Sequence, residues 1–382
     1  MVQIEKFRAG EMRLGIDYKY FLPNLINTEW VWSDPKINKL LENASFQLGQ
    51  LNSYARIVPN IDLFIHLHIT KEAVVSSKIE GTQTHFDEAL LQKEDVDPER
   101  KDDWQEVQNY TQALNEAISE LERLPISSRL LLRTHQILMQ GVRGEKKIPG
   151  EYRRSQNWIG GKSLSDAIFI PPQHDHLNEL IGDLEKFIHN EHLEIPLLIK
   201  VAIIHYQFET IHPFLDGNGR IGRLLITLFL IEKQVLTKPL LYLSSYFEKD
   251  KNLYYDNLTK VRSNNDMTQW IKYFLVGIAQ TAQKAAETLG NILELKMKTE
   301  QIIQQEFGRR MKPALLLHNY LLGQPLVSIK QVQETCGLSP KASGELVNLF
   351  VEKSLLKEFT GQHRNRIFIY ESYLNLFEDY PN

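Results

Sequence analysis

The sequence predicts a mainly α-helical protein with a small β-hairpin and a C-terminal unit of mixed helices and strands. Apolar residues recur at three- and four-residue spacings along most of the 382 residues, as in amphipathic helices. Between residues 150 and 172 the pattern changes to paired glycines, a short β-branched and aromatic run and a Pro-Pro stop. Residues 313–382 combine helical patterns with two strand-like runs around a glycine.

Bulk composition limits the classes of function. The 44 Lys and Arg nearly balance the 48 Asp and Glu, so no overall field favours nucleic acid or a membrane surface. Cys336 is the only cysteine, which excludes an intramolecular disulfide and a multi-cysteine zinc cluster and fits a reducing compartment. The N-terminus has no secretory signal pattern, and no apolar run approaches the roughly 20 residues that span a bilayer. We expect a cytoplasmic protein with no membrane partner.

The N-terminal region, residues 1–103, is expected to be helical. Apolar residues between Ile37 and Leu48 give one apolar face to a helix over 35–57. The charged stretch from Lys93 to Asp103 has almost nothing to bury, so it predicts an exposed connection. We therefore place a domain boundary after residue 103.

The central domain is predicted over residues 104–290. Helical spacing returns at Trp104 and should stop by Pro125, where proline cannot continue a helix. After the expected hairpin, helical patterns resume and a helix over 195–211 leads directly into the most informative segment. His205 lies on the apolar stripe of that helix, where a hydrogen-bonded core histidine is favoured over a second catalytic base.

The third domain, residues 291–382, is predicted to be a winged helix-turn-helix. A short helix should end at Gly337, and a longer one should start at Ser339. Seven Lys or Arg and four Glu lie between Lys312 and Arg366, a weaker basic face than DNA readers usually present. DNA binding is left open, but it ranks below packing on the core, self-association into a homo-oligomer or recruitment of a partner.

Residues 212–223 read HPFLDGNGRIGR and carry the chemistry. Gly217 and Gly219 let the backbone turn sharply and approach a ligand closely. Their N–H groups would form an anion nest at the N-terminus of the helix that follows, where phosphates bind well. A chance helix-loop-helix turn with surface arginines is the alternative, and it explains twelve such positions poorly.

The charged residues of this segment fit a nucleotide. Arg220 and Arg223 supply two guanidinium forks, three residues apart, that match phosphate oxygens. Asp216 offers a hard oxygen ligand for the Mg²⁺ that accompanies a nucleotide. His212 titrates near neutrality and is placed to take a proton from an attacking hydroxyl. The segment has no nucleophilic side chain of its own, which favours direct in-line transfer.

The segment resembles the Fic signature, H-P-F-x-D-G-N-G-R-x-G-R, at every position, and the likeness extends from about Leu40 to about Ala285. The resemblance implies a helical core, ATP with Mg²⁺, and transfer of AMP to a Ser, Thr or Tyr hydroxyl of a target protein or of the chain itself. It makes His212 the general base and Asp216 the metal ligand. The Gly-Asn-Gly-Arg centre disfavours the phosphate-transferring relatives. The phosphate-binding set that it implies is Gly217, Asn218, Gly219, Arg220, Ile221, Gly222 and Arg223.

The segment SSKIEG, residues 76–81, places Ser76 and Glu80 on one face of a helix end. Local sequence alone favours an exposed Glu before a capping glycine. The segment is similar to the inhibitory motif of the family, however, which implies that Glu80 pairs with Arg223 and blocks the γ-phosphate. The chain is therefore expected to restrain its own activity.

Two further segments resemble ligand-contacting parts of the family. Residues 156–171 resemble the flap, in which Ile168, Phe169 and Ile170 would bind an extended target by strand addition, although a covering hairpin is the alternative. Tyr254 and Tyr255 lie where relatives contact adenine, and buried aromatic packing explains them equally well. Two rival functions remain: removal of AMP by water at the same site, and nucleotide sensing by a winged-helix regulator.

Overall fold

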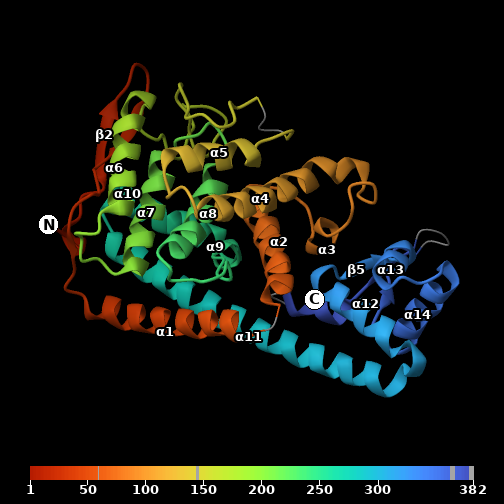
Figure 1. Ribbon diagram of the computed structural model, residues 1–382. Helices are drawn as coiled ribbons and strands as arrows, with labels where there is room; N and C mark the ends of the chain where they lie inside the picture. Colours follow the sequence, from red (N-terminus) through yellow and green to blue (C-terminus); the bar gives the residue numbers. More distant parts are fainter. Residues whose placement is uncertain (59, 143–145, 362–365, 378–382) are drawn as a thin grey trace.

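The computed structural model describes residues 1–58, 60–142, 146–361 and 366–377 (Figure 1). Helices make up most of these residues, as the sequence predicts. The central bundle is built around α7 (Leu197–Ile211) and α8 (Asn218–Glu232), which are buried on nearly all sides. A helix that is apolar all round belongs in a core, and these two helices enter and leave the signature segment, residues 212–223.

Short strands occupy the first 31 residues, where the sequence analysis expects helix. They are β1 (Val2–Gln3), β2 (Gly10–Leu14), β3 (Lys19–Pro23) and β4 (Trp30–Val31). Strands β2 and β3 pair antiparallel, and β1 pairs with β4 in parallel. Tyr20 and Phe21 are buried, and the N–H of Phe21 donates to the carbonyl of Ile170 at 2.9 Å. The strands thus pair with one another, and one hydrogen bond ties β3 to the distant segment at Ile170.

Two long helices brace one side of the bundle. In α1 (Pro35–Ile57), Asp34 caps the N-terminus by accepting from the N–H of Lys36 at 2.9 Å, and Pro35 takes the first helical position. This helix packs along α11 (Met267–Glu306), which continues from the bundle to the C-terminal unit (Figure 1). One continuous helix therefore links the two parts of the chain.

The remaining helices enclose α7 and α8. Helix α2 (Ile61–Ile79) carries the SSKIEG segment at its end and packs against α4 (Lys101–Glu120) and α9 (Ser244–Lys249). The others are α3 (Phe86–Ala89), α5 (Ser128–Leu138), α6 (Leu177–His189) and α10 (Lys251–Asn264). Helix α2 is thus held between the bundle and α9, with its end facing α8.

The flap segment, residues 156–171, contains no β-strand, so the expected hairpin is reduced to one bridge. The N–H of Ile159 donates to Phe169 O at 2.8 Å, and the N–H of Phe169 donates back at 3.1 Å. Beyond this bridge, the Asp166 carboxylate accepts from the N–H groups of Lys162 and Ser163 at 2.8 and 2.7 Å. Side-chain capping of the turn takes the place of further strand pairing.

The C-terminal unit contains the helices and strands that the sequence predicts. Its elements are α12 (Met311–Gly323), β5 (Leu326–Ser328), α13 (Ile329–Cys336), α14 (Pro340–Glu352), β6 (Lys357–Glu358), β7 (Ile367–Ile369) and α15 (Glu371–Leu374). The strands form an antiparallel sheet in the order β5-β7-β6. Gly337, with φ of 65°, ends α13, and Ser339 caps α14. Residues 362–365 of the expected turn lie outside the described residues, and the winged-helix assignment stays a prediction.

Two of the expected domain boundaries fall inside helices. The boundary after residue 103 lies within α4, and the boundary after residue 290 lies within α11. At the first boundary, α4 already begins at Lys101, within the charged run before Trp104. At the second, α11 continues without a break across residue 290. Over the described residues, no helix is long and apolar enough to cross a membrane.

Candidate functional site

His212 lies at the junction between α7 and the loop that leads to α8. It ends α7 in the left-handed conformation, with φ of 51°, and its N–H donates to Phe208 O at 2.9 Å. Its carbonyl accepts from Arg153 Nε at 3.0 Å and from Asn157 Nδ2 at 3.1 Å. A non-glycine residue in this conformation is sparsely populated, and the two side-chain donors hold it there.

The His212 ring is largely enclosed, with 18 % of the side chain exposed. Burial, with the nearby guanidinium groups of Arg262 and Arg153, lowers the pKa of His212 to about 3. Its Nδ1 lies 3.9 Å from Glu209 Oε2, and burial raises the pKa of Glu209 to about 7. The imidazole is therefore neutral at pH 7 and able to accept a proton.

The loop between His212 and α8 is held by side-chain contacts with its backbone. Asn218 Nδ2 donates to Phe214 O at 2.8 Å, and the N–H of Phe214 donates to Asn218 Oδ1 at 2.8 Å. The Asn218 side chain therefore shapes the loop, which is a different role from the phosphate contact that the resemblance implies. Its backbone N–H still belongs to the first turn of α8.

His135 supports the same loop from α5. The N–H of Gly150 donates to its Nδ1 at 3.0 Å, so its Nε2 carries the proton and donates to the carbonyl of Asp216 at 3.0 Å. Its ring stacks on Phe214 with centroids 3.8 Å apart, and burial lowers its pKa to about 4. The neutral His135 ring therefore holds the backbone carbonyl of Asp216, the candidate metal ligand, in place.

Asp216 is the one acidic residue of the signature segment, and it borders solvent. Its side chain is 46 % exposed, and Oδ1 accepts from the N–H of Gly217 at 2.6 Å. Gly217 then starts α8 with φ of 76°, a conformation that favours glycine. Mg²⁺ needs one or two carboxylates besides phosphates and water, so the exposed carboxylate of Asp216 fits that ion.

Arg220 projects from the first turn of α8 into a buried acidic partner. Its Nη1 donates to Glu106 Oε2 at 3.0 Å, and its Nη2 lies 3.7 Å from Asp216 Oδ1. Glu106 comes from α4, 114 residues earlier in the chain. The guanidinium is thus pre-positioned at the loop by a carboxylate behind it.

Arg223 is paired with the end of α2. Its Nε donates to Ser76 Oγ at 2.8 Å, and its Nη2 donates to Ser76 O at 2.9 Å and to Glu80 Oε1 at 2.7 Å. The Arg223 side chain is 1 % exposed, whereas that of Glu80 is 34 % exposed. The ion pair therefore has one fixed, buried member and one member that borders solvent.

The Glu80 carboxylate also lies over the first turn of α8. A Cβ added to Gly219 would come within 2.2 Å of Glu80 Oε1 and 2.9 Å of Arg223 Nη1. Gly219 is required at this position because the carboxylate fills the space that a side chain would take. A carboxylate here occupies the place where a helix N-terminus binds an anion.

Electrostatics support an ionised Glu80. Burial works to raise its pKa, but the guanidinium groups of Arg223 and Arg220, together with His212, hold the pKa of Glu80 below its ordinary value. For Arg223, burial works to lower the pKa, and the Glu80 carboxylate raises it above the ordinary value. Both members of the pair are therefore charged at neutral pH.

Ile221 and Gly222, the other phosphate-binding candidates on α8, face the interior of the helical bundle. Ile221 is fully buried in the hydrophobic core, so its side chain does not reach a ligand. Gly222 faces α7: a Cβ there would lie 2.2 Å from Glu209 Oε1, and its carbonyl accepts from His205 Nδ1 at 3.0 Å. These two residues allow close helix packing, which places the first turn of α8.

The adenine candidates have different surroundings. Tyr254 is buried against Phe247, and its hydroxyl donates to His205 Nε2 at 2.9 Å, because the other His205 nitrogen already donates to Gly222 O. Tyr254 is therefore a packing residue, and His205 is the hydrogen-bonded core histidine that the sequence favours. Tyr255 is partly exposed, and Lys251 Nζ lies 5.7 Å from its ring centroid.

The three flap candidates differ in exposure and in their contacts. Ile168 is 80 % exposed, whereas Phe169 lies under Arg262, whose guanidinium carbon is 3.9 Å from the ring centroid. The carbonyl of Ile170 is used by β3. Of the three, only Ile168 exposes most of its apolar side chain to solvent.

Sequence reasoning missed several residues that hold this site. Arg153, Asn157, His135, Glu106 and Glu209 all contact the signature segment or its partners. Arg153 ends the tetrapeptide GEYR, residues 150–153, and the other four carry no local pattern. Among the described residues, no group of three or more His, Cys, Asp or Glu side chains could hold a metal ion by itself.

Comparisons with known proteins point to one family. A model described as "Fic/DOC family N-terminal" matches residues 38–119, and one described as "Fic/DOC family" matches residues 125–230. A probable protein adenylyltransferase of Aquifex aeolicus is 31% identical over 172 residues, which are 44% of this chain and 50% of that protein. The protein adenylyltransferase Fic of Drosophila melanogaster is 26% identical over 190 residues, 49% of this chain and 35% of that protein. The chain thus spans half or less of the length of these curated relatives.

Two solved structures share the fold. A Fic family protein from Desulfovibrio desulfuricans superposes with a TM-score of 0.58 at 21% identity, over 88% of this chain and 96% of that one. Fic-1 from C. elegans superposes with a TM-score of 0.50 at 19% identity, over 68% of this chain and 74% of that one. At these identities the likeness concerns the fold alone.

Proposed function

Because the chain belongs to the Fic/DOC family, we propose that it is a protein adenylyltransferase, restrained by Glu80, that moves AMP from ATP to a Ser, Thr or Tyr hydroxyl of a target protein. One observation carries the proposal. The Glu80 carboxylate lies on Arg223 and over Gly219, at the N-terminus of α8 where phosphate would bind. A built-in anion at a phosphate site is what competitive self-inhibition requires.

The reaction follows from the position of His212. The target hydroxyl oxygen forms a bond to the α-phosphorus, the bond from that phosphorus to the bridging oxygen breaks, and pyrophosphate leaves. The hydroxyl proton passes to the neutral imidazole of His212. The low pKa of this group keeps it unprotonated before ATP binds, and the negative phosphates then stabilise the imidazolium that forms.

The first turn of α8 holds the phosphates. The N–H groups of Asn218 and Gly219 would form the nest, and Arg220, oriented by Glu106, would neutralise developing charge. Asp216 would hold Mg²⁺, which neutralises charge on the leaving pyrophosphate when it is bound. Arg223 would bind the γ-phosphate once Glu80 has left it.

The target protein would lie across the flap segment, with Ile168 as its apolar contact. Any protein with an accessible Ser, Thr or Tyr hydroxyl can be the acceptor, and this chain itself is included. For the C-terminal unit, the winged-helix expectation favours self-association or partner recruitment ahead of DNA, because its basic residues are few. The single cysteine supports a cytoplasmic setting.

Wild type, Glu80→Gly and His212→Ala are incubated with Mg²⁺ and ATP labelled on the α-phosphate, with and without cell lysate. We expect a mass gain of one AMP on protein, largest with Glu80→Gly and absent with His212→Ala. A double variant, Glu80→Gly/His212→Ala, should also show no gain. If ATP binds but none of the variants gains mass, the transfer proposal is wrong.

Removal of AMP by water is the second candidate, because the Glu80 carboxylate lies over the first turn of α8, beside the place where phosphate would bind. A carboxylate in that position can orient a water molecule toward a bound phosphate. Purified AMP-modified protein is the substrate that separates the two directions. Release of AMP by wild type, lost in Glu80→Gly, would favour removal over transfer.

A further inference from the structure

Arg262, near the end of α10, contacts the helix turn that leads to His212. Its Nε donates to Thr210 Oγ1 at 3.3 Å, and its Nη2 donates to Glu209 O at 3.3 Å. Both acceptors lie in the last turn of α7, directly before His212. A helix leaves its last carbonyls without a partner inside the helix, and a guanidinium near the C-terminus satisfies them favourably. Arg262 therefore holds the end of α7 in place from the side of α10.

The face of the same guanidinium covers an aromatic ring of the flap segment. Arg262 Cζ lies 3.9 Å from the ring centroid of Phe169, well inside the limit of about 6 Å for attraction between a cation and an aromatic face. The Phe169 ring also lies beside Phe21 of β3, with the two centroids 6.0 Å apart. Arg262 therefore connects the end of α7 to the inner side of the flap, whereas the neighbouring Ile168 is 80 % exposed.

Backbone contacts of the flap are few, so the packing of the Phe169 ring matters for its position. One bridge joins Ile159 to Phe169 across the segment, and one hydrogen bond joins Ile170 O to the N–H of Phe21 in β3. A segment with so few backbone hydrogen bonds opens locally at a small cost in free energy unless side chains hold it. The stack of Arg262 on Phe169 is the contact that joins this part of the flap to the end of α7.

We propose that Arg262 is a positioning residue, which holds the flap against the end of α7 and so sets where a target segment on the flap lies relative to His212. The hydrogen bonds to α7 fix the guanidinium plane, and the fixed plane then fixes the Phe169 ring. Because Ile168 is the next residue, its exposed side chain takes its place from that ring. The hold on the flap stands on these contacts alone, whereas its effect on a target rests on the proposed function.

Charge is a second way for Arg262 to act on His212. Burial lowers the pKa of His212 to about 3, and the charge of Arg262 works in the same direction. A lysine would keep a charge at this position, but its ammonium group has no planar face to stack on a ring and no fork to reach two acceptors. Arg262→Lys therefore separates the two roles, because the stack predicts a loosened flap and charge alone predicts wild-type behaviour.

The first test measures amide hydrogen exchange in the full-length protein without nucleotide. It compares wild type with Arg262→Lys, Phe169→Leu and their double variant, and with the control Lys284→Gln. We expect exchange at residues 159 and 168–169 to be roughly 2- to 30-fold faster in both single variants, the range that one cation–π contact supplies. Because both changes remove the same contact, the double variant should exceed the faster single variant by no more than about twofold. Exchange in α8 should not change, since the core stays folded.

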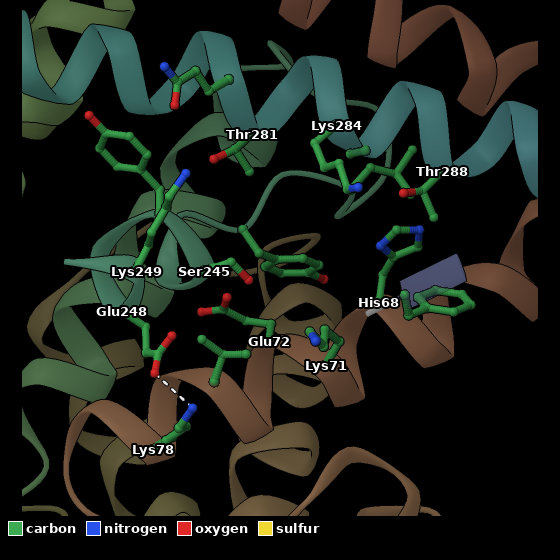
Figure 2. Close-up of a pocket in the computed structure, with 17 residues that line it drawn as sticks. His68, Lys71, Glu72, Lys78, Ser245, Glu248, Lys249, Thr281, Lys284 and Thr288 are labelled. Atoms are coloured by element: carbon green, nitrogen blue, oxygen red, sulfur yellow. Dashed lines mark ion pairs between the residues drawn. The ribbon is translucent and has the colours of Figure 1, made fainter. Parts of the chain in front are cut away.

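The control lies away from the flap. Lys284 of α11 is exposed and lines a pocket between α2, α9 and α11, whose lining residues come from other parts of the chain than the flap (Figure 2). Lys284→Gln should therefore match wild type. Wild-type exchange in Arg262→Lys, with faster exchange in Phe169→Leu, would show that the ring is held without Arg262 and would overturn the proposal. Equal acceleration of the flap and of α8 in both variants would mean that Arg262 supports the whole core rather than the flap, and would overturn it as well.

The second test measures AMP transfer in the Glu80→Gly background, with a purified acceptor protein that the labelled-ATP experiment identifies. Adding Arg262→Lys or Phe169→Leu should raise the KM for the acceptor roughly 2- to 30-fold, while the Kd for ATP stays within about twofold. An unchanged KM for the acceptor in both variants would overturn the effect on the target. Because hydrogen exchange needs no catalysis, a chain that transfers no AMP would refute the proposed function, and the exchange rates would still decide whether Arg262 holds the flap.

Discussion

Replacing Glu80 by glycine removes the carboxylate that holds Arg223 and covers Gly219. A hydrogen bond between charged groups contributes about 1.5–3 kcal/mol. ATP must displace this contact in wild type and need not do so in the variant. At 1.4 kcal/mol per tenfold, the variant should bind ATP roughly 10- to 150-fold more tightly. Transfer at subsaturating ATP should rise by a similar factor.

The variant should also be less stable without nucleotide. Arg223 is 1 % exposed, and without Glu80 its charge keeps only the bonds to Ser76. Breaking a buried pair by removing one partner costs about 3–5 kcal/mol, and the 34 % exposure of Glu80 places this case at or below the lower end. ATP should restore the loss, since its γ-phosphate replaces the carboxylate.

Equilibrium ATP binding and thermal unfolding, with and without Mg²⁺-ATP, measure both effects. Glu80→Gln keeps the side-chain shape but removes the charge, so it should lie between wild type and Glu80→Gly. Glu94→Gly removes an exposed carboxylate far from α8 and should behave as wild type. If Glu80→Gly and Glu94→Gly bind ATP equally well, Glu80 does not compete for the phosphate site and the reasoning fails.

Three further predictions concern neighbouring groups. Ser76→Ala removes the acceptor for Arg223 Nε and should lower the free energy of unfolding, measured with denaturant, by about 1.5–3 kcal/mol, the contribution of a hydrogen bond to a charged group, while it raises ATP affinity less than Glu80→Gly does. Burial raises the pKa of Glu72 from 4.5 to about 7, so its contribution to stability is full below pH 4.5 and falls as the pH rises to 7. The stability of Glu72→Gln relative to wild type, from denaturant unfolding, should therefore increase by up to about 3 kcal/mol between pH 4.5 and pH 8, and a flat difference would refute it. Ile168→Asp should lower transfer to protein while leaving ATP affinity and the unfolding midpoint within about 0.5 kcal/mol of wild type, because Ile168 is an exposed surface residue.

The sequence predicts the local part of the site well and the distant part poorly. Twelve consecutive residues contain the turn, the helix start and the charges, because backbone geometry at glycine and helix N-termini is a short-range property. Glu106 and His135 orient Arg220 and the Asp216 carbonyl from other helices, and no spacing in the sequence connects them. Their positions depend on how distant helices pack together, and a single sequence does not reveal which helices come into contact.

The same limit explains the differences in fold. Strands β2 and β3 pair with each other and one hydrogen bond ties β3 to Ile170, and residues 156–171 form a capped loop because Asp166 takes the N–H groups that a strand would pair. The sequence allows Tyr254 to contact adenine, but in the structure its hydroxyl donates to His205 Nε2. The contacts of β3 with Ile170 and of Tyr254 with His205 are long-range, whereas Asp166 caps a turn only three to four residues away.

The position of Glu80 explains how the restraint can be released without unfolding α2. The end of α2 is a poor place for a carboxylate, because the helix dipole is negative there. Glu80 is stabilised instead by the positive end of α8 and by Arg223. Ser76 and Ser77 are fully buried, whereas the next residue after Glu80 is Gly81, with φ of 107° and open space around it. A phosphate that binds Arg223 and the N-terminus of α8 therefore replaces both groups that hold Glu80 inward, and rotation of one side chain toward solvent is enough to open the site.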